Sequence, residues 1–173
     1  MPTGLGGTAP NLDVFLDQGP TAVAIESKFT EYLSAKPASF NDSYEDLVEE
    51  IAQKSWKDLY RDLKSDPAQY RHIDVAQLIK HYLGLRAAVD NETFERITLV
   101  YLYWEPLDAR EWSAFDAHRQ DLLEIMARVQ DPEVPLISIT YPELWDEWSR
   151  PEAPDWVKEH LSALRSRYGF AIS

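Results

Sequence analysis

The chain has 173 residues, a length that suits one domain with a sizeable hydrophobic core. It contains no cysteine, which excludes a disulfide framework, a zinc–thiolate site and a cysteine nucleophile. Its formal net charge of −13 argues against a protein that holds nucleic acid by bulk positive charge. No apolar run approaches the roughly 20 residues of a membrane span, and no basic-then-apolar leader begins the chain. We therefore expect a cytoplasmic protein without membrane contact, in which residues 1–173 form a single domain and the Gly-rich residues 1–9 are a flexible lead-in.

Residues 11–29 predict a β-hairpin, because two runs of apolar and β-branched residues flank the turn signal Asp17-Gln18-Gly19-Pro20. Alternate residues of a strand share a face, so Glu26 and Lys28 point the same way on the second strand. A four-residue loop at the turn signal places Asp13 diagonal to Glu26, and a loop shifted by one residue places the two directly opposite. Opposed Cβ atoms lie about 5 Å apart and diagonal ones about 7–8 Å. Either register puts both carboxylates and the lysine on one face.

Two carboxylates held close together repel each other unless a cation joins them. Mg²⁺, with Mn²⁺ as the other candidate, suits such a site because it prefers oxygen ligands and keeps several waters. A lysine beside the ion can orient or deprotonate a water, or stabilise charge on a phosphate. A solvated ion pair on the wet face of the hairpin is the alternative interpretation of the same residues.

The run Pro10-Asn11-Leu12-Asp13, followed by Glu26-Ser27-Lys28 on the next strand, resembles the PD-(D/E)xK nuclease superfamily and its restriction-endonuclease-like fold. The resemblance implies metal-dependent hydrolysis of phosphodiester bonds in DNA. It assigns Asp13, Glu26 and the backbone carbonyl of Ser27 as metal ligands, and it places Lys28 at the attacking water. In that superfamily a helix and a strand normally precede the aspartate, and this chain has no room for them.

A helix is predicted from residue 42 to residue 64, where Asp42 and Glu45 form a capping-box-like start. The segment from Lys54 to Arg86 holds seven basic and four acidic residues in an otherwise acidic chain. One interpretation is a solvated helix face whose charges pair along the helix. The other is a set of phosphate contacts, for which the candidates are Lys54, Lys57, Arg61, Lys64 and Lys80.

A second helix is predicted from residue 73 to residue 89, with Gln77 on its polar side. Many members of the resembled superfamily carry a helical glutamine near the metal site, so the resemblance implies a catalytic role for Gln77. A plain polar helix face is the alternative. The four histidines, which show no paired metal-ligand spacing, are expected to be structural: His72, His81, His118 and His160.

Residues 97–104 predict a central strand, because they are apolar on both faces. A helix to about residue 130 and a strand at 136–141 follow, which together imply a parallel pair with a right-handed crossover. The aromatic and acidic residues 141–148 fit either a partner-binding patch or a cap on the core, and 155–167 predict a last helix.

The expected fold class is α/β, or α+β, with a mixed central sheet that contains an antiparallel hairpin and a β-α-β unit, and with helices on both faces. The expected function is Mg²⁺-dependent hydrolysis of DNA phosphodiester bonds. The alternative is a catalytically inactive nuclease-like module, or an unrelated α/β module, that binds a protein partner or a second copy of itself. The acidity of the chain and the missing elements before Asp13 favour that alternative.

Overall fold

The structure is a computed structural model that describes residues 11–34 and 37–172, so the expected lead-in at 1–9 lies outside the described residues. A four-stranded mixed sheet with the strand order β1-β2-β3-β4 forms its centre. β1 is antiparallel to β2, whereas β2, β3 and β4 are parallel to one another. This arrangement confirms the mixed sheet with a hairpin and a β-α-β unit. The strands are β1 Val14–Asp17, β2 Thr21–Lys28, β3 Arg96–Tyr103 and β4 Leu136–Thr140.

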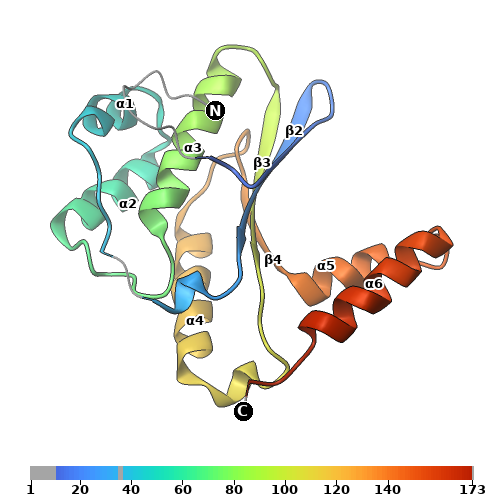
Figure 1. The fold of residues 1–173 in the computed structure, drawn as a ribbon. Helices are drawn as coiled ribbons and strands as arrows, with labels where there is room; N and C mark the ends of the chain where they lie inside the picture. The colour runs from blue at the N-terminus through green and yellow to red at the C-terminus, as the bar shows by residue number, and fades with distance from the viewer. Residues whose placement is uncertain (1–10, 35–36, 173) are drawn as a thin grey trace.

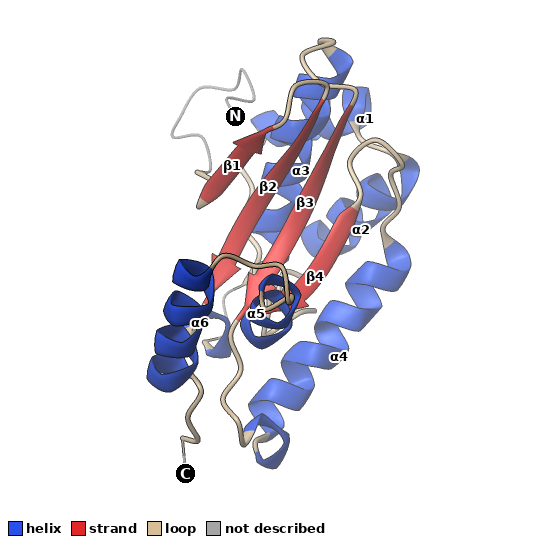
Figure 2. Cartoon of the chain, turned by 90° about the vertical axis from the view of Figure 1, so that its right-hand side faces the viewer, coloured by secondary structure: helices blue, strands red, loops and turns tan. Residues whose placement is uncertain are grey.

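Helices cover both faces of the sheet, as expected. α1 to α4 lie together on one side, and α5 and α6 lie on the other, near the carboxyl ends of the parallel strands (Figures 1 and 2). Short 3₁₀ helices precede α1 and α4. The helices are η1 Glu31–Leu33, α1 Ser43–Ile51, α2 Lys54–Ser65, α3 Val75–Asp90, η2 Ala109–Glu111, α4 Ser113–Arg128, α5 Tyr141–Trp148 and α6 Asp155–Tyr168.

The hairpin of β1 and β2 has the second of the two predicted registers. Asp17 pairs with Ala22, and the Gln18 amide donates to the Thr21 carbonyl at 2.9 Å, which leaves Gly19 and Pro20 as the turn. Gly19 has a φ of 84°, in the left-handed region that glycine adopts without a steric penalty. The turn therefore determines which residues of β1 pair with which residues of β2.

The hydrophobic core lies between the sheet and the layer of α1 to α4. On β2 the buried face carries the small residues Ala22 and Ala24 and then Glu26. α3 is apolar around most of its circumference, which is typical of a helix enclosed by other elements. Its buried residues include Leu78, Ile79, Tyr82, Leu83 and Leu85.

The single helix predicted for residues 42–64 is wrong, because two helices occupy this segment. Ala52 and Gln53 are extended, with ψ angles of 144° and 153°. The Gln53 amide donates to the Tyr82 hydroxyl on α3 at 2.9 Å, which satisfies a backbone donor that a continuous helix would have used. The break lets α1 and α2 each pack on α3, and no local sequence signal marks it.

The aromatic segment at residues 141–148 forms α5, a helix that the sequence pattern did not identify. Thr140 and Glu143 form a reciprocal capping box at its start, with Pro142 in the first turn. Trp145 is buried, whereas Trp148 is 51% exposed. The segment thus caps part of the core and also presents an aromatic side chain to solvent.

No helix in the described ranges is long and apolar enough to cross a membrane.

Candidate active site

Glu26 and Lys28 lie near the carboxyl end of β2, on the face of the sheet that packs against the layer of α1 to α4. They are two residues apart in a strand and therefore point the same way. Glu26 is 2% exposed, and the Lys28 ammonium forms an ion pair with its Oε1. The Lys28 side chain is itself only 12% exposed. This is a buried pair, and the solvated hairpin face considered as an alternative does not describe it.

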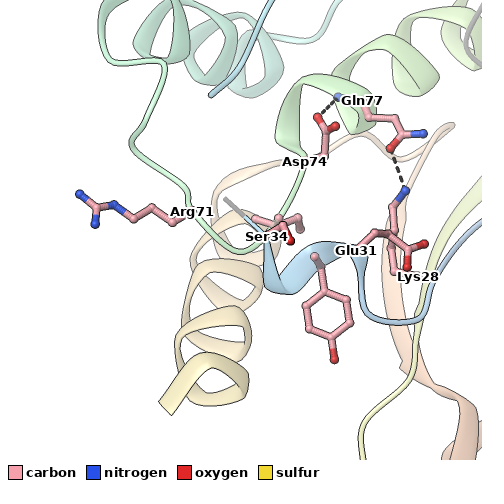
Figure 3. A pocket seen from close by; sticks show the side chains of 8 residues that line it. Lys28, Glu31, Ser34, Arg71, Asp74 and Gln77 are labelled. Atoms are coloured by element: carbon pink, nitrogen blue, oxygen red, sulfur yellow. Dashed lines mark hydrogen bonds between the residues drawn. The ribbon is translucent and has the colours of Figure 1, made fainter. Parts of the chain in front are cut away.

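One face of α3 supplies a partner to each member of this pair. Gln77 Oε1 accepts a hydrogen bond from Lys28 Nζ at 2.8 Å (Figure 3). His81, one helical turn further on, places Nε2 2.9 Å from Glu26 Oε2. The start of the helix is fixed by Asp74, whose carboxylate accepts from the Gln77 amide at 2.9 Å as the helix cap. The helix therefore sets the positions of both side chains that meet β2.

His81 is the residue of this site whose contact with Glu26 the sequence did not reveal. Its spacing of four from Gln77 is the signal that was available, because residues i and i+4 share a helix face. The ring is 3% exposed and faces a carboxylate from a strand more than fifty positions earlier in the chain. Periodicity within one element does not report such a contact.

The pKa of Glu26 is lower than its usual value. Burial alone would raise it, but the contacts with His81 and Lys28 together outweigh the loss of hydration. Glu26 is therefore an anion at neutral pH in spite of its burial. A buried anion of this kind is stabilised by positive charge, as its ion pair with the Lys28 ammonium shows.

A small pocket of about 40 Å³ opens beside Lys28. It has room for a few water molecules and is too small for a nucleotide. Figure 3 shows Lys28 and Gln77 pointing toward each other at its edge, with Asp74 beside Gln77 and Arg71 directed away from the others. The charged and amide residues that line it are Lys28, Glu31, Arg71, Asp74 and Gln77.

Asp13 lies just before β1, where the ladder of the hairpin ends. Its amide donates to the Ile25 carbonyl at 3.1 Å, and its carboxylate accepts from the Ser27 amide at 2.7 Å. Asp13 thus spans the backbone on both sides of Glu26. Its side chain is exposed, and within the described residues it forms no hydrogen bond or ion pair with Glu26 or Lys28.

Ser27 points away from Glu26, as strand alternation requires. Its hydroxyl lies 2.7 Å from the Tyr141 hydroxyl on α5, on the other face of the sheet. Its amide binds Asp13, so this residue connects the hairpin, the sheet and α5. A metal-ligand role for the Ser27 carbonyl stays a prediction.

The basic residues considered for phosphate binding fall on α2 and α3, and each has a partner within the protein. On α2, Lys54, Arg61 and Lys64 pair with acidic side chains at 2.5, 2.6 and 3.4 Å. Lys57 donates to the Glu49 carbonyl, and Lys80 donates to the Ser39 carbonyl. Lys54, Arg61 and Lys64 are exposed and Lys57 is half-buried, so the solvated-face interpretation agrees with these contacts, while phosphate binding stays a prediction.

The residues around Glu26 suit a divalent ion in their chemistry. Within residues 11–34 and 37–172, no three His, Cys, Asp or Glu side chains converge as a complete set of ligands. The Glu26 Oε2 atom is nevertheless buried, anionic and without an aligned hydrogen-bond donor, which is the kind of group that a cation stabilises. Asp13 provides a second carboxylate on the neighbouring segment.

Comparison with known proteins was made at the level of families, of curated proteins and of solved structures. Residues 2–169 match the family model REase-ARP, described as "Restriction Endonuclease associating with ARP". Neither the curated proteins nor the solved structures gave a match. The family match covers nearly the whole chain, and the mixed sheet with its antiparallel hairpin agrees with it. The chain therefore belongs to this restriction-endonuclease family and has the PD-(D/E)xK restriction-endonuclease-like fold.

Proposed function

We propose that this protein is a divalent-metal-dependent nuclease that hydrolyses phosphodiester bonds in DNA, with residues 1–173 acting as one domain. The observation that carries the proposal is the buried Glu26–Lys28 pair, held by Gln77 and His81 beside a small pocket. Buried ionic groups are costly, and they cluster where chemistry needs them. Membership of a restriction-endonuclease family supports DNA as the substrate.

Asp13, Glu26 and the Ser27 carbonyl are the groups that would hold Mg²⁺ or Mn²⁺. A bound ion would supply a water of lowered pKa and would polarise the phosphate. Lys28 contacts Glu26 and lines the pocket, where its ammonium can orient the attacking water and stabilise charge on the phosphate. Gln77 accepts from Lys28 and keeps its Nζ directed at the pocket edge.

Phosphate binding by the basic side chains of α2 and α3 is part of the same proposal. Exposed ion pairs stabilise a protein by only about 0–1 kcal/mol each, so a phosphate can displace the acidic partners of Lys54, Arg61 and Lys64 at little cost. Lys57 and Lys80 donate to backbone carbonyls instead. The residues are Lys54, Lys57, Arg61, Lys64 and Lys80.

A second candidate function is a binding module for a protein partner, including a second copy of the chain. The observation in its favour is the exposure of Trp148 and Trp156, at 51% and 70%, on the two helices that lie across the sheet from Glu26. Exposed aromatic side chains are typical of interfaces. The two candidates differ in whether the Glu26 site binds a cation.

Calorimetric titration with Mg²⁺ and Mn²⁺, combined with a DNA cleavage assay, tests the proposal. The wild type should bind at least one of the ions and cleave DNA in its presence, and Asp13→Ala should lose both properties. Asp155→Ala, a carboxylate removal at the exposed start of α6, is the matched control and should behave as wild type. A wild type that cleaves no DNA with any divalent ion would leave the binding module as the function.

A further inference from the structure

The contact between Glu26 and His81 is short, but it is not a well-formed hydrogen bond. Nε2 of His81 lies 2.9 Å from Oε2 of Glu26, and both atoms are buried. Neither atom has an aligned hydrogen-bond partner, although both can accept a ligand. The two atoms form an ion pair without the alignment of a hydrogen bond, and buried polar atoms normally have an aligned partner, so this contact needs an explanation.

A shared metal ion explains this arrangement. Ligands that bind one ion at right angles, with bonds of about 2.1 Å, lie about 3 Å apart. The separation of 2.9 Å between Nε2 and Oε2 fits such a pair. Lys28 contacts the other oxygen of the carboxylate, Oε1, so that Oε2 is the oxygen left for an ion.

We propose that His81 is a ligand of the divalent ion held by Glu26, and that this ligand makes the site prefer Mn²⁺ to Mg²⁺. The inference rests on the proposed function, since it concerns the same ion. Mg²⁺ is bound by oxygen ligands, whereas imidazole nitrogen suits transition-metal ions. One nitrogen and one carboxylate oxygen therefore favour the transition-metal ion of the two candidates.

The placement of Asp13 agrees with an added ligand on α3. The Asp13 carboxylate is engaged by the Ser27 amide on the hairpin, whereas His81 approaches Glu26 from the helix layer. Gln77 and His81 then have separate roles on one face of α3. Gln77 positions Lys28 through a hydrogen bond, and His81 adds one nitrogen ligand beside Glu26.

Pulsed electron paramagnetic resonance of the Mn²⁺-loaded protein tests the assignment directly, because a coordinated imidazole nitrogen gives a hyperfine coupling to the ion. The wild type should show this coupling. His81→Gln should lose it, and its affinity for Mn²⁺ should fall at least about tenfold, since even outer-shell partners of metal ligands contribute about 10–100-fold. Its affinity for Mg²⁺ should change much less.

His118→Gln is the matched control, because His118 is equally buried and contacts Tyr101 and Tyr32 rather than Glu26. It should keep the nitrogen coupling and the preference for Mn²⁺. If the wild type binds Mn²⁺ in a way that Glu26→Gln abolishes, yet shows no nitrogen coupling, His81 is not a ligand and the proposed function survives. If the wild type binds neither ion and cleaves no DNA, the proposed function fails as well. The measurement on the wild type is decisive even if a variant fails to fold.

Discussion

Lys28 is a buried member of the site, and this determines what its removal should do. Lys28→Ala should lower the cleavage rate by about 10²–10⁴-fold, the usual contribution of general acid–base catalysis. Metal affinity should stay similar or rise slightly, because a positive charge near the ion is gone. Single-turnover cleavage and calorimetric titration at the same pH measure the two effects separately.

The same variant should also be less stable than the wild type. Lys28 donates to Glu26 and Gln77, so its loss leaves buried acceptors with fewer partners and should cost about 1–3 kcal/mol in the free energy of unfolding. Lys158→Ala, which removes a half-exposed lysine from α6, is the control and should change stability by less than about 0.5 kcal/mol. Wild-type cleavage by Lys28→Ala would contradict the role given to this lysine.

His118 gives a pH-dependent contribution to stability. It is fully buried, and burial lowers its pKa from 6.5 to about 4. The unfolded chain takes up this proton near pH 6.5 and the folded chain only near pH 4, so the unfolded state binds more protons between these values. The contribution is therefore complete above pH 6.5 and is lost as the pH falls toward 4, by up to about 3 kcal/mol.

Urea unfolding of the wild type and of His118→Phe across this range isolates the effect, because the difference between the two curves cancels the titration of the acidic residues. The variant should lack the component lost between pH 6.5 and 4. His160→Phe, a change at an exposed histidine, should keep the wild-type dependence. Parallel pH profiles for the wild type and the His118 variant would show that this interpretation is wrong.

At the scale of elements, Tyr82 connects the break between α1 and α2 to the loop between α4 and β4. Its hydroxyl accepts from the Gln53 amide and donates to Asp131 at 2.8 Å. Tyr82→Phe removes both bonds within a buried site and should lower the free energy of unfolding by about 1–3 kcal/mol. Tyr44→Phe is the control, because the Tyr44 hydroxyl has no hydrogen bond to any described residue. Equal stability losses in the two variants, measured by urea unfolding, would contradict a special role for Tyr82.

The elements also show which structural features could be predicted from the sequence pattern. Period-two alternation predicted that Glu26 and Lys28 share a face, and helical periodicity predicted α3 with Gln77 on it. Helical periodicity did not predict the break at Ala52 and Gln53, because the group that stabilises this break, the Tyr82 hydroxyl, lies on another helix. For the same reason, the contact of His81 with Glu26 was not predicted. Local patterns give the direction of a side chain, whereas its partner depends on how the elements pack.

At the scale of the whole molecule, a net charge of −13 opposes contact with DNA unless local basic residues compensate for it. If the α2 lysines bind phosphates, DNA affinity measured without divalent ions should fall steeply with salt. Each phosphate contact contributes about 0.9 to the slope of log affinity against log salt concentration. The double variant Lys57→Ala/Lys64→Ala should therefore lower that slope by about two.

Lys158→Ala on α6 is again the control and should leave the slope unchanged. A slope that is equal in the wild type and in the double variant would exclude the α2 face as the DNA-binding surface. Fluorescence anisotropy with a labelled duplex, at several salt concentrations, makes the comparison.

The position of β2 between β1 and β3 also orders events during synthesis of the chain. The hairpin is local, but β2 pairs in parallel with β3, and Lys28 meets Gln77 across 49 positions of sequence. Contacts between distant segments form later than local ones. A ribosome releases Glu26 and Lys28 well before α3 and β3, so the nascent hairpin holds both charged residues without the groups that position them. The site of Glu26, Lys28, Gln77 and His81 can therefore form only after α3 has been made and has docked on the sheet.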